Sequence, residues 1–215
     1  MKVFRVNDIF YSLQGEGYNT GRAAMFVRFA GCNLRCPFCD TEFDSFREMT
    51  GEEIVEEITR CEVPRTFVVL TGGEPTLQVD EAFVDLLHQH GYEVAMESNG
   101  TRPAPPNLDW LTVSPKVVGG AVVRVNEGAR FPDELKIIFD ENTNPESFLV
   151  PPYLRTPVPP YPRTPEPPYP LLYLQPCDTG DAERNAHIIN RCVDYIKAHP
   201  QWRLSLQTHK LVGFK

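Results

Sequence analysis

The sequence has no long hydrophobic run. Its apolar stretches, such as residues 67–70 and 171–174, are far shorter than the roughly 20 residues that cross a bilayer as a helix. The first residues also lack an apolar segment followed by a small-residue cleavage site, so no secretory signal is visible. We therefore expect a cytoplasmic protein that does not bind a membrane.

The sequence has fewer basic than acidic residues. The 215 residues include 21 Lys and Arg against 29 Asp and Glu, which gives a formal net charge of −8. An acidic surface opposes non-specific contact with phosphate backbones, so we expect no direct nucleic-acid binding, although a local basic site remains compatible with this charge. The length predicts a single domain over residues 1–215.

Cysteine is scarce as well, with six residues. In a reducing compartment, cysteines serve metal or catalytic chemistry more often than disulfides. Cys61, Cys177 and Cys192 stand alone in the sequence, and we expect them to be buried apolar thiols.

Proline, by contrast, is abundant and concentrated in one segment. Of 21 prolines, 11 lie at positions 145–170, where an eight-residue repeat starts at Pro151, Pro159 and Pro167. Proline at this density favours polyproline II and cannot sustain a helix or an internal strand. We interpret residues 145–170 as a low-complexity insertion within the domain, with a Pro-Tyr ligand for an SH3- or WW-type groove as the alternative.

Short apolar runs alternate with segments of helical periodicity in the rest of the chain. The runs predict strands at residues 24–29, 66–70, 93–96, 111–113, 134–139, 171–174 and 203–206. Helices are predicted after a capping box at Thr50, after Asp80 with a stop at Gly91, and at residues 182–199. Such alternation predicts an α/β fold with about six to seven mostly parallel strands. Because the middle connections are too short or too rich in proline for full helices, we expect an incomplete (β/α) barrel.

Polar motifs follow most of these strands. They begin at Gly31, Thr71, Glu97, Ser114, Gln175 and Gln207. The carboxyl ends of parallel strands face one rim, where active sites of α/β enzymes are built. The pattern therefore predicts an enzyme with one pocket at this rim.

Three cysteines follow the first predicted strand with the spacing C-x₃-C-x₂-C, at Cys32, Cys36 and Cys39. A closed structural zinc site uses four ligands, and no fourth cysteine or histidine lies nearby. Three thiolates on an iron–sulfur cluster would instead leave one iron open for another ligand. The spacing alone remains compatible with zinc and a distant histidine.

Combined with Thr71-Gly72-Gly73-Glu74-Pro75, this triplet resembles the radical S-adenosylmethionine (SAM) superfamily. Further segments are similar to one family within it, the 7-carboxy-7-deazaguanine synthases of queuosine biosynthesis. These segments are residues 10–17, 26–28, 39–41, 114–116, 175–176 and 207–215. The resemblance covers the chain outside the proline insertion, and it implies conversion of 6-carboxy-5,6,7,8-tetrahydropterin to 7-carboxy-7-deazaguanine with loss of ammonia.

The resemblance also implies a role for each matching residue. Cys32, Cys36 and Cys39 would hold a [4Fe–4S] cluster, and the Thr41 hydroxyl would bind Mg²⁺, with Asp40 as the competing ligand. The implied SAM site comprises Phe38, Gly72, Gly73, Glu74, Glu97, Ser98, Ser114, Pro115, Lys116, Gln175 and Pro176. The implied substrate site comprises Leu13, Gln14, Gly15, Glu16, Arg28, Thr71, His209 and the terminal carboxylate of Lys215.

The chemistry of three of these side chains agrees with a carboxylated pterin as substrate. Arg28 offers a planar fork for a carboxylate, and Gln14 and Glu16 offer acceptors and donors for the edge of a pyrimidine-like ring. The resemblance implies that a 5′-deoxyadenosyl radical carries the reaction, so that no side chain acts as the principal nucleophile. It also implies an external electron donor, such as flavodoxin or ferredoxin, and a homodimer.

Two other functions share part of this pattern. A small radical SAM activase that installs a glycyl radical on a partner protein would need the cysteines and Gly72-Gly73-Glu74 but not Gln14, Glu16 and Arg28. A non-catalytic iron–sulfur or zinc protein would need only the metal ligands and would use the proline-rich segment for docking.

Overall fold

The structure is a computed structural model. It describes residues 2–39, 42, 45–61, 67–118, 121–122, 131–149 and 170–214. None of the helices that these residues form has the length and apolar character needed to cross a membrane.

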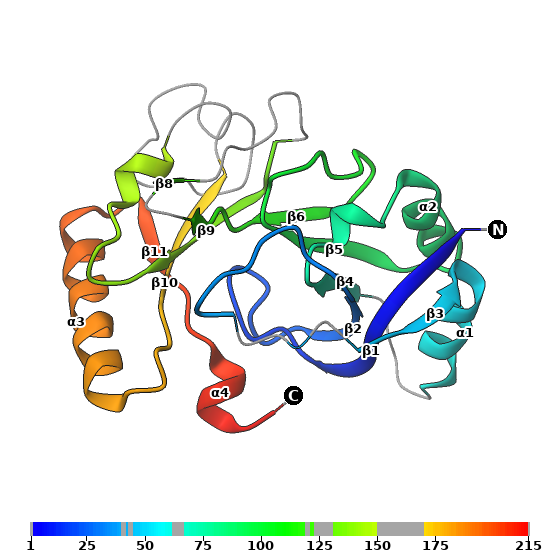
Figure 1. The fold of residues 1–215 in the computed structure, drawn as a ribbon, viewed down its shortest axis with the longest axis horizontal. Helices are drawn as coiled ribbons and strands as arrows, with labels where there is room; N and C mark the ends of the chain where they lie inside the picture. Colours follow the sequence, from blue (N-terminus) through cyan, green and yellow to red (C-terminus); the bar gives the residue numbers. More distant parts are fainter. Residues whose placement is uncertain are drawn as a thin grey trace.

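A mixed, mostly parallel sheet organises the described part of the chain (Figure 1). Its nine strands lie in the order β11-β10-β9-β6-β5-β4-β2-β1-β3, and each neighbouring pair from β11 to β2 is parallel. The parallel strands are β2 (Ala23–Phe29), β4 (Phe67–Gly72), β5 (Glu93–Ser98), β6 (Trp110–Val113), β9 (Glu134–Phe139), β10 (Leu171–Pro176) and β11 (Trp202–Leu204). All seven predicted strands are thus present, and their parallel arrangement is confirmed.

Two antiparallel strands at one edge were not predicted. β1 (Val3–Leu13) pairs with β2 on one side and with β3 (Arg47–Thr50) on the other. Polar residues and a register shift between Val6 and Asp8 interrupt the apolar alternation of β1, which explains why the sequence pattern did not reveal it. A separate two-stranded hairpin is formed by β7 (Val117–Val118) and β8 (Ala121–Val122).

The helices begin where their capping residues predict. The Thr50 hydroxyl accepts a hydrogen bond from the Glu53 amide at 3.2 Å, while the Glu53 carboxylate accepts one from the Thr50 amide at 2.7 Å. Asp80 caps the next helix through the Phe83 amide at 3.1 Å. The helical elements are α1 (Gly51–Arg60), η1 (Pro75–Leu77), α2 (Glu81–Gln89), η2 (Pro145–Phe148), α3 (Ala182–Ala198) and α4 (Thr208–Val212).

The two faces of the sheet carry different side chains. Alternate residues such as Val68, Leu135 and Leu172 are fully buried in the main hydrophobic core, which also contains the apolar faces of the helices. The intervening residues of the strands, such as Thr71 and Lys136, point to the opposite, inner face of the sheet, where they line a cavity.

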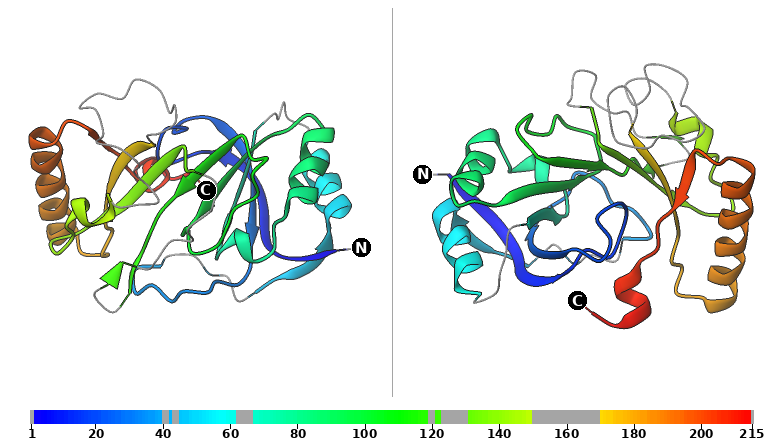
Figure 2. Two further views of the ribbon diagram at one scale, coloured as in Figure 1. Left: turned by 90° about the horizontal axis from the view of Figure 1, so that it is seen from above. Right: turned by 180° about the vertical axis from the view of Figure 1, so that it is seen from behind.

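The barrel is incomplete because β11 and β3, the edge strands of the described sheet, do not pair with each other, and its outer layer of helices is interrupted as well. α1 packs against β1 and β3, α2 lies beside α1 and contacts β5, and α3 covers β10 and β11 at the other end of the sheet (Figures 1 and 2). No helix follows β5 or β6 in the described residues. The expected partial barrel is therefore confirmed.

The proline-rich segment lies mostly outside the described residues. At its borders the structure describes η2 and then Pro170, which directly precedes β10. Residues 150–169 are not described, so the interpretation of the insertion stays a prediction.

Candidate active site

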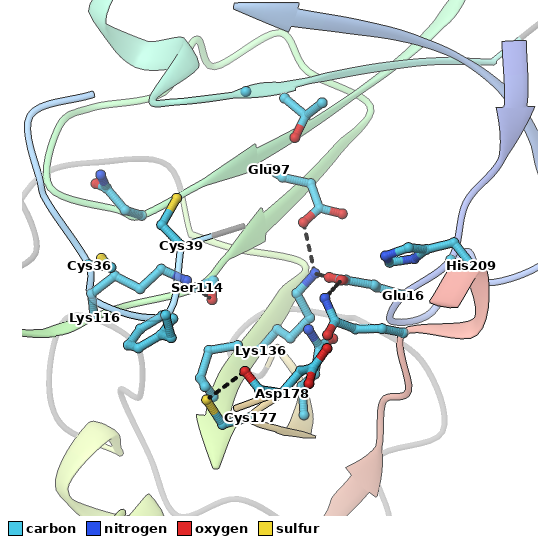
Figure 3. A pocket seen from close by; sticks show the side chains of 18 of the residues that line it. Glu16, Cys36, Cys39, Glu97, Ser114, Lys116, Lys136, Cys177, Asp178 and His209 are labelled. Atoms are coloured by element: carbon cyan, nitrogen blue, oxygen red, sulfur yellow. Dashed lines mark hydrogen bonds and ion pairs between the residues drawn. The ribbon is translucent and has the colours of Figure 1, made fainter. Parts of the chain in front are cut away.

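A cavity of about 540 Å³ lies on the inner face of the sheet. Its wall includes the predicted residues Leu13, Gln14, Gly15, Glu16, Arg28, Cys32, Cys36, Phe38, Cys39, Thr71, Gly72, Gly73, Glu97, Ser98, Ser114, Lys116, Gln175, Pro176 and His209. Cys36, Cys39, Ser114 and Lys116 lie on one side of this cavity, and Glu16, Glu97 and Lys136 lie on the other (Figure 3). The structure thus brings most of the predicted cofactor and substrate residues around one space.

The cysteine loop leaves the carboxyl end of β2 and is tied to neighbouring loops. The Cys39 amide donates to the Cys36 carbonyl at 3.1 Å, which closes a turn between the last two cysteines. The Asn99 amide group after β5 donates to the Asn33 side chain at 3.0 Å. These bonds hold the loop over the cavity rim.

The three thiols of the cysteine loop suit an iron–sulfur cluster in which each thiolate binds a different iron. All six cysteines are among the described residues, and none of them forms a disulfide. Burial raises the pKa of the Cys32 thiol and likewise that of Cys36, where the Lys116 ammonium opposes it. A cubane binds each thiolate through a different iron, and three thiols on one loop fit such a cluster.

The Gly72-Gly73 segment packs directly against the start of the cysteine loop. The Gly73 amide donates to the Phe29 carbonyl at 3.0 Å, and the Glu74 amide donates to the Gly31 carbonyl at 2.9 Å. A Cβ at Gly73 would lie 2.0 Å from the Gly31 oxygen, so only glycine permits this approach. The two glycines therefore fix the spacing between the two loops as well as forming part of the cavity wall.

Glu74 and Pro115, both predicted in the SAM site, do not line the cavity. Glu74 is fully buried; its Oε1 accepts hydrogen bonds from Thr76 and from the Ser98 hydroxyl, and its Oε2 accepts one from the Asn99 amide. Both carboxylate oxygens thus serve internal bonds that hold the loop after β5. The predicted place of Glu74 in the SAM site stays a prediction.

The side chains beyond β6 form a compact group near the cysteines. The Lys116 ammonium donates to the Ser114 hydroxyl at 2.7 Å and lies 6.0 Å from the centre of the Phe38 ring. Burial lowers the pKa of Lys116, and the charge of Lys136 lowers it further, while Cys36 opposes both. This group places a cation at the cysteine side of the cavity.

The loop after β1 reaches the cavity from the opposite end of the parallel strands. Leu13 pairs with Ala23, the first residue of β2, so this loop lies at the amino end of the sheet. Tyr18 stacks on Trp110 at the start of β6, with ring centres 4.8 Å apart, and its amide donates to Glu134 at the start of β9 at 2.8 Å. The loop therefore closes the amino end of the barrel.

A network of charged and amide side chains lines this closed end. The Lys136 ammonium lies 2.5 Å from the Glu16 carboxylate and 2.8 Å from that of Glu97. The Gln14 amide donates to Glu97 at 2.9 Å, and the Gln207 amide donates to Glu16 at 3.0 Å. Burial would raise the pKa of Glu16, but Lys136 and Gln207 outweigh it and lower the value to about 2.

The C-terminal segment is bound to the same loop. Thr208 donates to the Gly15 carbonyl through both its amide, at 3.0 Å, and its hydroxyl, at 2.9 Å. A Cβ at Gly15 would lie 2.4 Å from His209, so this histidine packs directly on the loop. Further out, Lys210 pairs with Asp178 at 2.9 Å. The segment thus forms the last wall of the cavity.

Sequence comparisons identify the family. The radical SAM superfamily pattern matches residues 26–120. The chain is 40% identical over 211 residues to 7-carboxy-7-deazaguanine synthase from Bacteroides thetaiotaomicron, with 98% of each chain covered. It is 41% identical over 233 aligned positions to the synthase from Bordetella pertussis, again with 98% of each covered. The chain belongs to the 7-carboxy-7-deazaguanine synthase family. Its fold is similar to the crystal structure of QueE from Escherichia coli, with a TM-score of 0.73, 27% identity, and 95% and 93% of the two chains covered.

Family membership confirms the predicted function. The synthase is a radical SAM carbon–nitrogen lyase of queuosine biosynthesis, and its superfamily implies a [4Fe–4S] cluster and SAM. The glycyl-radical activase and the non-catalytic zinc protein are therefore set aside. The open choice between zinc and an iron–sulfur cluster is decided in favour of the cluster.

The synthase cavity also contains residues that the sequence did not single out, among them Lys136, Cys177 and Asp178. The expectation that Cys177 is a buried apolar thiol is wrong, because this side chain is partly exposed in the cavity wall. Cys192 is fully buried as expected, and Cys61 packs against the core. A lysine within the apolar strand 134–139 was the available signal for Lys136.

Three predicted residues of the synthase lie outside the described residues. They are Asp40 and Thr41, the two candidates for a magnesium ligand, and the C-terminal Lys215.

Proposed function

We propose that this synthase converts 6-carboxy-5,6,7,8-tetrahydropterin into 7-carboxy-7-deazaguanine, releasing ammonia as a ring contracts. One observation carries this proposal: a single cavity has thiols on one side and carboxylates and amides on the other, and its wall also contains a guanidinium. The first side suits a cluster and SAM, and the second suits a carboxylated heterocycle with N–H donors.

In this proposal Cys32, Cys36 and Cys39 hold the cluster, and the segments at Gly72 and Ser114 contact SAM. When bound, the cluster and SAM supply a 5′-deoxyadenosyl radical that takes a hydrogen atom from the ring carbon bearing the carboxylate. Thr41 is the proposed magnesium ligand.

Arg28 and the wall opposite the thiols orient the substrate in this proposal. Arg28 lies on the inner face of β2, 5.2 Å from the centre of the Phe10 ring, and its fork can pair with the substrate carboxylate. Gln14 and Glu16 face the polar edge of the ring, and His209 closes the pocket beside them. The loop and the C-terminal segment exclude water around the reacting ring.

Other parts of the proposal concern the whole enzyme. We place residues 1–215 in one domain, with residues 145–170 as an insertion. An external donor such as flavodoxin or ferredoxin would supply the electron. We also propose that the enzyme acts as a homodimer in the cytoplasm.

Anaerobic reconstitution tests the proposal. The purified chain should take up about four irons and cleave SAM, and it should release ammonia and 7-carboxy-7-deazaguanine from carboxytetrahydropterin. Cys36→Ser should abolish iron uptake and turnover. Cys61→Ser, which changes a thiol outside the cavity, should retain both. Tightly bound zinc with no SAM cleavage, or SAM cleavage without ammonia release, would contradict it.

A further inference from the structure

Lys136 occupies an unusual position for a lysine. It lies in the middle of β9, on the inner face of the sheet, and its side chain is only 3% exposed. Its ammonium contacts Glu16 and Glu97, which come from the loop after β1 and from β5 (Figure 3). Burial would lower the pKa of Lys136, but the charges of Glu16, Glu97 and Glu134 outweigh burial and raise it.

One oxygen of each glutamate faces the ammonium, and a glutamine holds the other. Glu97 Oε2 accepts from Lys136 and its Oε1 accepts from Gln14, whereas Glu16 Oε2 accepts from Lys136 and its Oε1 accepts from Gln207. The Glu16 amide also donates to the Gln14 side chain at 3.2 Å. Three chain segments that are distant in sequence therefore meet at one ammonium.

These bonds hold the Glu16 and Glu97 carboxylates in place and leave some of their lone pairs free to accept further hydrogen bonds. A carboxylate has about four lone-pair sites, and only two sites on each of these glutamates are used by the bonds above. Both glutamates and Lys136 line the cavity. With two carboxylates and one ammonium, the group retains one negative charge and presents acceptor sites to a ligand.

We propose that Lys136 is a positioning residue that clamps Glu16 and Glu97 as paired acceptors for the ring N–H and amino donors of the substrate. The inference rests on the proposed function, and it assigns Glu97 to the substrate rather than to SAM. A role limited to structure would require only that Lys136 stabilise the fold.

Removing the Lys136 ammonium should change the protonation of Glu16 and Glu97. In Lys136→Met two carboxylates would face each other in a buried site, and one of them would hold a proton near neutral pH. The titratable groups around Glu16 and Glu97 are Glu134 from β9, Lys116 from the loop after β6 and His209 from α4. A protonated carboxyl presents a donor where the ring needs an acceptor, so ligand affinity should fall near neutral pH and recover partly as pH rises.

The test measures binding of 7-carboxy-7-deazaguanine to the reconstituted enzyme from about pH 6 to pH 9. We expect Lys136→Met to bind at least about tenfold more weakly than wild type at pH 7, the scale of losing one charge-assisted hydrogen bond, with a smaller deficit at pH 9. Lys136→Met/Glu97→Gln removes the additional negative charge, so its deficit relative to wild type should not depend on pH. Lys2→Met, which breaks an exposed pair with Asp80, serves as the control and should bind like wild type.

Iron content, SAM cleavage without substrate and thermal unfolding are measured on the same variants. A deficit that is constant with pH in Lys136→Met, or equal affinity in Lys136→Met and wild type, would overturn the proposal. So would failure of both Lys136 variants to fold, because it would show that the residue serves the fold. Failure of the wild-type enzyme to bind this ligand at all would instead reject the proposed function.

Discussion

Glu134 makes the stability of this enzyme depend on pH in an unusual direction. The side chain lies at the start of β9 and is 2% exposed, with one oxygen accepting the Tyr18 amide bond that anchors the loop after β1. Burial raises the pKa of Glu134 to about 7, against the opposing effects of Lys136 and the Tyr18 amide.

The direction of this pH dependence follows from proton linkage. In the unfolded chain the carboxyl ionises near 4.5, and in the folded enzyme near 7, so between these values the folded state binds more protons. The free energy of unfolding should therefore fall as pH rises through this window. At about 1.4 kcal/mol per pKa unit, the full effect is about 3.5 kcal/mol, of which about 2.5 kcal/mol falls between pH 5 and pH 8.

Glu134→Gln removes the titration while keeping a carbonyl oxygen for the Tyr18 amide. Thermal or urea unfolding of wild type and variant across pH 5 to 8 should show that the wild type loses about 2.5 kcal/mol more than the variant. In a chain of this length that corresponds to a difference of roughly 5 °C in Tm. Glu48→Gln, at an exposed position on β3, should follow the wild type. Parallel pH profiles for wild type and Glu134→Gln would refute the reasoning.

Three further predictions concern the two ends of the cavity. Gly73→Ala would place a Cβ 2.0 Å from the Gly31 oxygen, so the two loops must separate, and we expect lower iron content together with a stability loss of about 1–3 kcal/mol. Arg28→Gln should raise KM for carboxytetrahydropterin at least about tenfold, by loss of a charge-assisted pair, while iron content stays that of wild type. Cys177→Ser should also retain the wild-type iron content, because three other thiols form the cluster site; loss of iron in this variant would show that Cys177 is a ligand.

Local sequence signals predicted the parallel part of the fold well. The strand at residues 134–139 has the bounds predicted for it, because an apolar run rich in branched residues ends there at a polar turn. The cap at Thr50 was likewise correct, since a capping box depends on only four consecutive residues. β1 escaped prediction because its stability comes from pairing with two neighbours rather than from its own pattern.

The compact motifs of the site were easier to recognise in the sequence than its long-range network, for a similar reason. The cysteine triplet and Gly72-Gly73 are compact motifs, whereas the Lys136 network joins residues that lie 120 and 39 positions away in the sequence. Glu74 shows what a motif alone does not reveal: its carboxylate forms hydrogen bonds inside the protein. Motifs identify which residues are near a site, but burial and hydrogen bonding decide which of them face the ligand.

The division of the cavity into two ends agrees with the extent of the superfamily pattern. That pattern spans residues 26–120, which include the cysteine loop, the paired glycines and Lys116 beside them. Most of the polar residues at the other end lie outside this span: Gln14 and Glu16 precede it, and Lys136 and Gln207 follow it. A radical generator common to many enzymes needs the first set, whereas recognition of one heterocycle needs the second. Glu97 lies within residues 26–120, yet it bonds to Gln14 and Lys136, which lie outside them. The residues expected to bind the substrate are therefore not confined to the segments outside the superfamily pattern.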